Sequence, residues 1–374
     1  MDRIRKISLF VFTTVTVFSC IKPFHPASIS SANLNMLVVD GFIHPGSAST
    51  IKLSRTLNIT DSFQVVPELN AQLYLEGNSG SSISFQPGSL NNYTCATPAL
   101  SENELYRLRI ILQNGQEYLS DFVEVKKSPP IDTLEWEEDG NVSIFVSTHD
   151  PAAQARYYKW EYDETMEYRA TYEAIADWVD NQVVFFQPDE YRYRCYKYFN
   201  SNNILIANTS SLSNDVVSHS RITSIPNDNS KIGHRYSILV KQYVLTQEAY
   251  KYWQILQNNS EQNGNLFDPQ PASLRSNIHS TSNPAEPVVG FFSVSGYSEK
   301  RLFIRYSQLK YKPVSEYLQS CGVTFISLDA AAAYLNNSTM RIAYFTSSSS
   351  LAIAHNFCVD CRLQGGTTGK PPYW

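Results

Sequence analysis

The chain has 374 residues, of which 43% are hydrophobic, 13% aromatic and only 17% charged. This length allows two domains with sizeable cores. The net charge is −5 and no long basic run is present, which excludes the electrostatic footprint of a nucleic-acid-binding protein. The abundance of Tyr, Thr, Val and Ser with few charges favours an exported β-sheet protein.

The N-terminus predicts a lipoprotein signal peptide. Three basic residues within the first six are followed by an apolar stretch, 7–18, that is too short to span a bilayer stably. Ser19 then precedes Cys20, and a small residue directly before such a cysteine is typical of a bacterial lipobox. We expect residues 1–19 to be removed, Cys20 to carry the lipid, and residues 20–35 to form a polar tether. An ordinary secretory signal is the alternative.

Residues 36–128 predict a β-sandwich. Apolar and polar residues alternate in 71–75 and in 106–110, which is the period of a half-buried strand. Asn114-Gly115 between two such segments is a strong hairpin signal. Several short strands within about ninety residues are typical of a sandwich. The Ser128-Pro129-Pro130 segment marks the predicted domain boundary.

Residues 129–374 predict a larger, β-rich domain, with Trp136 and Trp160 in its core. Residues 168–187 fit either a short helix or an extended excursion. We expect 287–295 to pair with 300–305 through a turn at Gly296, and 341–345 to form a last strand.

Two helices are expected in this second domain. The main one covers about 247–263, with Thr246 as N-cap and Gly264 as its left-handed end. Tyr252 and Trp253 lie on its apolar stripe, and we expect them to pack against the sheet. A short helix over about 328–335 follows Ser327, which is a good N-cap residue.

The cysteines predict disulfides in the C-terminal part. Cys358-Val-Asp-Cys361 lacks the helix that a redox dithiol needs and two of the ligands that a zinc site needs. An exported protein favours disulfides instead. The natural partners are Cys195 and Cys321, although the sequence does not give the pairing. One thiol is left over, so the fate of Cys95 stays open.

No catalytic motif is present. Neither Gly-X-Ser-X-Gly nor His-Glu-X-X-His occurs, and the seven histidines are scattered singly. We therefore expect a protein that is not an enzyme and that uses no metal or cofactor. One segment is a candidate ligand platform, because tyrosines alternate there with Arg and Lys, and tyrosine rings stack on sugars and peptides. Ordinary cross-strand packing is the alternative for this set: Tyr191, Tyr193, Tyr196 and Tyr198.

The chain resembles the Bacteroidota lipoproteins classed as domain of unknown function 4249. The resemblance covers nearly the whole chain. Its motifs include the lipobox at Cys20 and the following segments: Val39-Asp-Gly-Phe-Ile43, Leu53-Ser-Arg55, Pro129-Pro-Ile-Asp132, Tyr158-Lys-Trp-Glu-Tyr162, the 236–243 strand, Glu248–Trp253, Phe267–Pro271, Asn277-Ile278, Val289-Gly-Phe-Phe-Ser293, Lys300-Arg301 and Cys358-Val-Asp-Cys-Arg362. The sequence departs from the family pattern at Arg275-Ser276, where a glycine commonly precedes the asparagine.

This resemblance implies an outer-membrane lipoprotein with an immunoglobulin- or transthyretin-like N-terminal domain. It also implies an accessory role beside a TonB-dependent transporter, with no established catalytic residues. We therefore expect a lipid-anchored binding protein for nutrient uptake. The sequence does not indicate whether it lies on the periplasmic or the surface face of the outer membrane. A hydrolase acting on polymers is one alternative, which converging carboxylates in a deep pocket would favour. A structural or adhesive lipoprotein is the other. The loop 267–271, just past the main helix, is a possible partner contact.

Overall fold

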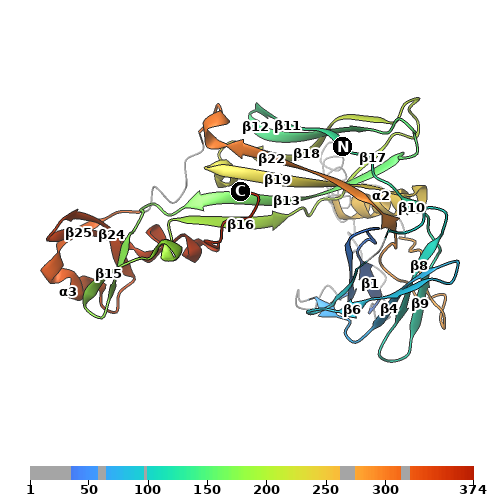
Figure 1. Cartoon of the computed structure of the whole chain (residues 1–374), viewed down its shortest axis with the longest axis horizontal. Helices are drawn as coiled ribbons and strands as arrows, with labels where there is room; N and C mark the ends of the chain where they lie inside the picture. Colours follow the sequence, from blue (N-terminus) through green and yellow to red (C-terminus); the bar gives the residue numbers. More distant parts are fainter. Residues whose placement is uncertain (1–34, 58–64, 97–98, 262–273, 313–320) are drawn as a thin grey trace, which may run out of the picture.

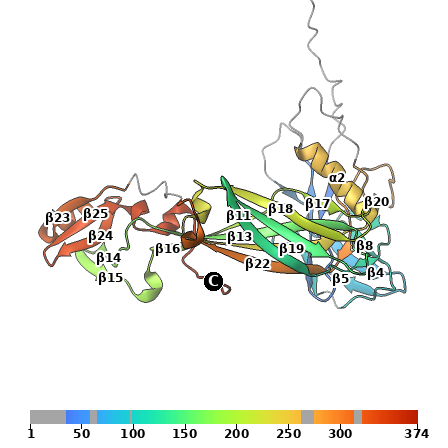
Figure 2. The ribbon, with the colours of Figure 1, turned by 90° about the horizontal axis from the view of Figure 1, so that it is seen from above.

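The computed structural model describes residues 35–57, 65–96, 99–261, 274–312 and 321–374. The predicted signal peptide, the tether up to residue 34, Gly264 and the loop 267–271 lie outside these ranges. Within these ranges the protein is mainly β, as predicted, with one main helix and one short helix. It is elongated: an N-terminal sandwich lies at one end, long antiparallel sheets fill the middle, and a small lobe lies at the other end (Figures 1 and 2).

The N-terminal sandwich is built from two antiparallel sheets. The alternation of apolar and polar residues explains why these strands form a sandwich. Leu73 and Leu75 on one strand, and Leu108 and Ile110 on its partner, all point into the core and are buried. The first sheet runs β1 (Leu37–Asp40), β2 (Ala48–Arg55), β7 (Asn92–Ala96), β6 (Gln86–Pro87), with β3 (Val66–Pro67) beside β2. The second runs β20 (Ile278–Ser280), β9 (Glu117–Ser120), β8 (Tyr106–Ile111), β4 (Gln72–Gly77), β5 (Ser82–Ser84).

A later segment of the chain completes this sandwich. Ile278 and Phe292 are buried in the same core as the N-terminal strands, and Val289 bridges to Val38 in β1. The predicted pairing of 287–295 with 300–305 is wrong. Instead, β21 (Val294–Ser295) pairs in parallel with β10 (Val125–Lys126), because the apolar side chains of this segment fill the first core.

The middle of the molecule consists of two facing sheets. One contains β11 (Ile131–Asp139), β12 (Asn141–His149) and β18 (Val216–Pro226). The other contains β16 (Arg194–Asn200), β13 (Tyr157–Arg169), β19 (Arg235–Val244) and β22 (Tyr297–Arg305), with β17 (Leu205–Asn208) beside β13. Trp160 is fully buried between them and donates a 3.0 Å hydrogen bond to Gln242, whereas Trp136 is half-buried against the same core. Both tryptophans therefore serve the core, as predicted.

Helix α2 (Gln247–Glu261) covers the junction between the sandwich and the long sheets. The Thr246 hydroxyl accepts a 3.2 Å hydrogen bond from the amide of Ala249, which confirms the predicted N-cap. Tyr252 is buried, and its hydroxyl accepts a 2.9 Å hydrogen bond from the amide of Gly290 in the sandwich. The helix thus contacts both bodies rather than the second core alone. None of the helices in the described ranges has the length and apolar character of a membrane span.

The distal lobe contains a hairpin and a three-stranded sheet (Figure 1). The hairpin, β14 (Ala176–Val179) and β15 (Gln182–Phe185), shows that the ambiguous region is an extended excursion. The sheet runs β23 (Thr324–Ser327), β25 (Ser350–His355), β24 (Met340–Ser347). Of these strands only β24, which contains the predicted strand 341–345, was expected. The short helix is present as a 3-10 turn, Leu328–Ala330, followed by α3 (Ala331–Leu335). The predicted N-cap is wrong, since the Ser327 side chain accepts no capping hydrogen bond; the Leu328 amide donates to the carbonyl of Ser349 at 2.8 Å.

Two disulfides tie the lobe together. Cys321 bonds to Cys358 within the lobe, and Cys195 on β16 bonds to Cys361. The predicted partners are therefore confirmed, and the structure supplies the pairing that the sequence left open. Cys95 takes part in neither disulfide and is buried in the first core.

Candidate functional site

A pocket of about 680 Å³ lies between helix α2 and the N-terminal sandwich. We call it the junction pocket. Its apolar wall combines side chains from three distant parts of the sequence: Leu105, Phe122, Val123, Ile255 and Phe291. Pockets with apolar walls and a few polar groups at domain interfaces are the usual binding sites for small molecules. The junction pocket is therefore our candidate functional site.

Local structure holds both sides of this pocket in place. On the helix, Glu248, Lys251, Tyr252 and Ile255 share one face, since they are spaced three or four residues apart. On the sandwich, the Asp121 amide donates a 2.7 Å hydrogen bond to the carbonyl of Asn277.

A buried amide side chain fixes the rear of the pocket. Asn277 donates to the Phe292 carbonyl at 3.0 Å and accepts from the Phe292 amide at 2.8 Å. It therefore anchors the segment that carries Phe291, and each polar group of the side chain has a partner.

The rim of the pocket carries charges of both signs. Glu124 is paired with Lys126 at 2.6 Å, and Asp121 lies 3.7 Å from His279. Within the described ranges, Lys251 and Arg275 have no carboxylate partner and Glu248 has no basic partner. Burial raises the pKa of the Tyr252 phenol, so this side chain stays neutral at physiological pH. The pocket can therefore take a solute with an apolar body and a polar group, and Lys251 and Arg275 are the side chains that would bind an acidic one.

The tyrosines predicted as a platform lie elsewhere, where the long sheet meets the lobe. Tyr191, Tyr193 and Tyr196 line an open hollow of about 380 Å³, and Tyr198 does not line it. Tyr196 is only 2% exposed and meets the ring of Trp374 edge-on, so it serves packing, whereas Tyr191 is 40% exposed. The alternation of tyrosines with Arg and Lys thus identified three residues that line the same hollow, and a ligand role for them stays a prediction.

Sequence reasoning did not find the junction pocket. Its walls come from 105–124, 246–255 and 275–291, and no short motif joins these stretches. The available signal was Asn277-Ile278 together with Val289-Gly-Phe-Phe-Ser293, which were noted only as family motifs. As for metals, no cluster of three or more His, Cys, Asp or Glu side chains in the described part of the chain is arranged to hold one.

These features define a mainly β protein of two sandwich-like bodies and a disulfide-tied lobe, with a pocket at the inter-body junction. The chain belongs to the family described as "Domain of unknown function (DUF4249)", whose model matches residues 21–301. No curated protein matches the sequence.

Solved structures resemble the chain only distantly. One is a two fibronectin type-III domain segment from chicken tenascin, with 11% identity and a TM-score of 0.17, covering 55% of this chain and 88% of that one. Another is described as a cytokine receptor complex, with 9% identity and a TM-score of 0.18, covering 55% of this chain and 90% of that one. Similarity at this level carries no functional argument.

Proposed function

We propose that this protein is a lipid-anchored binding protein of the outer membrane that delivers an organic acid to a TonB-dependent transporter. The observation that supports the binding role is the junction pocket, where apolar walls meet Lys251 and Arg275, which form no ion pair with the residues that the structure describes. The transporter and the membrane enter the proposal through the family resemblance and the lipobox. Fewer than twenty residues separate Cys20 from the first described residue, so the anchor keeps the sandwich within about 50 Å of the membrane.

A binding role also agrees with the state of the carboxylates in the lobe. A hydrolytic pair needs one carboxyl whose pKa is raised, so that it can donate a proton. Burial of Asp360 opposes its ionisation, but hydrogen bonds from the Arg362 side chain and amide outweigh burial and lower the pKa. This carboxylate is committed to an ion pair, which favours binding over acid catalysis.

The pocket can be tested with a dansylated fatty acid as fluorescent probe. Binding of the probe to the full chain is expected to weaken about tenfold in Lys251→Glu, which corresponds to about 1.4 kcal/mol. Ile255→Glu places a charge against the apolar wall and should weaken binding at least as much. Lys52→Glu, on an exposed strand position of the sandwich, makes the same charge change and is the matched control. Equal affinity in Lys251→Glu and Lys52→Glu would exclude the pocket.

The membrane and partner parts need separate experiments. Metabolic labelling with a palmitate analogue should mark the wild-type protein and not Cys20→Ala. Pull-down of the tagged lipoprotein from native outer membrane should recover a TonB-dependent transporter. Recovery of the lipoprotein alone under mild detergent would contradict the transporter role while leaving the pocket result unaffected.

A further inference from the structure

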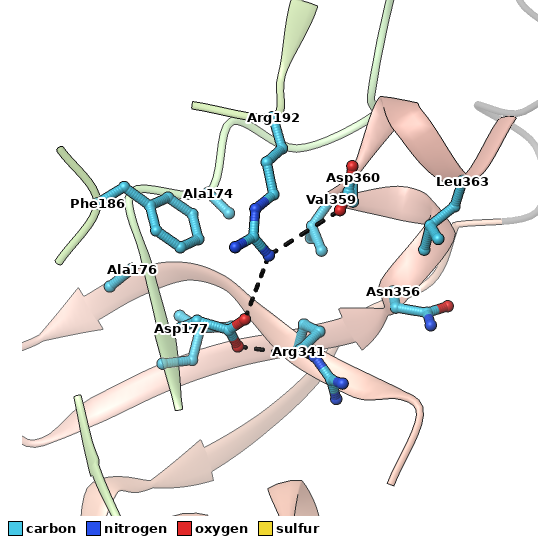
Figure 3. Close-up of a pocket in the computed structure, with 11 residues that line it drawn as sticks. Ala174, Ala176, Asp177, Phe186, Arg192, Arg341, Asn356, Val359, Asp360 and Leu363 are labelled. Carbon is cyan, nitrogen blue, oxygen red and sulfur yellow. Dashed lines mark hydrogen bonds and ion pairs between the residues drawn. The ribbon is translucent and has the colours of Figure 1, made fainter. Parts of the chain in front are cut away.

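The distal lobe contains a second cavity, partly open to solvent and separate from the junction pocket. It has a volume of about 190 Å³. Its walls come from the β14–β15 hairpin, the segment before β16, strand β24 and the turn 356–363 (Figure 3). We call it the distal cavity.

The two disulfides hold these walls in a fixed arrangement. Cys358 directly precedes the wall residue Val359, and Cys361 directly follows the wall residue Asp360. The partner of Cys358 is Cys321, three residues before β23, and the partner of Cys361 is Cys195 on β16, three residues after Arg192. A cavity whose walls are cross-linked needs little reorganisation to accept a ligand, and this lowers the cost of binding.

The ion-paired cluster at the distal cavity has an excess of positive charge. Arg362 donates to Asp360 through Nη2 at 2.8 Å and Nε at 3.0 Å, and thus offsets that carboxylate. The two other guanidinium groups both contact Asp177, at 3.5 Å from Arg192 and 3.7 Å from Arg341, and Arg192 also lies 3.9 Å from Asp360. The lining itself carries two arginines and two aspartates. With Arg362, which does not line the cavity, the cluster has three arginines and two aspartates among the described residues, and so one more positive than negative charge.

Among these arginines, Arg192 is the best placed to bind an anion. It donates one hydrogen bond to the rest of the described chain, at 3.5 Å, which is much longer than the 2.7–2.9 Å typical of charge-assisted hydrogen bonds. Arg341, in contrast, donates at 2.8 Å to the carbonyls of Ser338 and Met340. The Arg192 guanidinium lies 4.7 Å from the ring centre of Phe186, a cation–π contact. Figure 3 shows it between Asp177 and Asp360.

The rest of the cavity is apolar, apart from the Asn356 amide. Phe186, Ala174, Val359 and Leu363 contribute to the lining. A planar, forked guanidinium beside apolar side chains matches a carboxylate attached to a hydrocarbon body. We propose that the distal cavity binds a small organic monocarboxylate, which forms a bidentate pair with Arg192 and places its apolar part against Phe186 and Val359.

Isothermal titration calorimetry on the full chain tests this proposal, with benzoate, butyrate, methyl benzoate and inorganic phosphate as probes. Benzoate and butyrate should bind saturably, and the binding that depends on Arg192 should have one-to-one stoichiometry, separate from any binding at the junction pocket. Methyl benzoate, the uncharged ester of benzoate, should bind at least tenfold more weakly, and so should phosphate, which lacks an apolar body.

The variants locate the site. Arg192→Gln should abolish benzoate binding, and Arg192→Lys, which keeps the charge but loses the fork, should weaken it at least tenfold. Arg194→Gln is the matched control, since Arg194 lies two residues away and pairs with Glu167 at 3.3 Å. Near-ultraviolet circular dichroism and thiol titration check that each variant folds with both disulfides. Unchanged benzoate affinity in Arg192→Gln, equal losses in Arg192→Gln and Arg194→Gln, or no saturable binding to the wild type at millimolar benzoate would overturn the proposal.

Discussion

The ammonium of Lys159 lies 4.4 Å from the ring centre of Trp253, at the point where the sandwich, the long sheets and helix α2 meet. Lys159 is only 4% exposed, and its charge is balanced by an ion pair with Glu161. Phe42, from the sandwich, stacks on the same indole with ring centres 6.2 Å apart. One tryptophan thus holds three parts of the molecule together, and the junction pocket lies against the same helix.

Replacing this tryptophan should loosen the junction. Truncating a buried aromatic side chain commonly costs about 3–5 kcal/mol. Since Trp253 is only half-buried, we expect Trp253→Ala to lower the free energy of unfolding by about 2–3 kcal/mol in urea titrations. Trp253→Phe should cost less, because a ring remains over the ammonium. Gln254→Ala, exposed on the next position of the helix, is the control. A loss no larger than that of the control would show that the cluster adds no stability.

Removing a disulfide should release the lobe and leave the sandwich intact. Cys321 and Cys358 are 37 residues apart, so the loop-closure model assigns their bond about 4 kcal/mol. In the double variant Cys321→Ser with Cys358→Ser, amide hydrogen exchange should become faster in β23–β25. Exchange in β4 and β8, at the other end of the molecule, should stay unchanged and serves as the internal control. Unchanged protection in the lobe would contradict the prediction.

The sequence was sufficient for features that depend on local patterns. The alternation of apolar and polar residues predicted the strands of the sandwich. Thr246, as the N-cap, predicted the exact residue at which helix α2 begins. The export signal favoured disulfides, and Cys195 and Cys321 were correctly expected as the partners of Cys358 and Cys361, although the pairing was not. Each of these signals acts within a few residues or follows from the redox compartment.

Long-range relations were not readable from the sequence. The segment around Phe292 has the pattern of an ordinary strand, and only the unfilled core of the sandwich explains why it lies there. The distal cavity was missed because Asp177, Arg192 and Arg341 are far apart in the sequence and none belongs to a motif. The tyrosines were noticed by their alternation, whereas the intervening Arg192 is the residue that lines the cavity.

Acid should weaken the lobe through Asp360. Burial acts against the charged form, but hydrogen bonds from Arg362 prevail, so the folded-state pKa is below that of the unfolded chain. The charged pair therefore stabilises the lobe fully above the unfolded pKa of about 4, and this contribution is lost as the pH falls through the lowered folded pKa. Asp360→Asn should destabilise the lobe at pH 7, measured by hydrogen exchange. The gap between variant and wild type should close towards acid pH, and a gap independent of pH would contradict this account.

The contact between Gly290 and β1 should be the least tolerant of substitution. Gly290 has a φ of +133°, and a Cβ built there would lie 2.1 Å from the carbonyl oxygen of Val39. Gly290→Ala must therefore shift the strand that completes the first core and adopt a backbone conformation that costs about 1–3 kcal/mol. The Gly290 amide that donates to Tyr252 would move as well, so the junction pocket should lose probe affinity together with stability. Gly296→Ala is the matched control, since its nearest neighbour is the Lys126 carbonyl oxygen at 3.7 Å. Thermal unfolding and dansyl-probe titration of both variants decide the matter, and equal behaviour of the two would show that the close approach at Gly290 is not required.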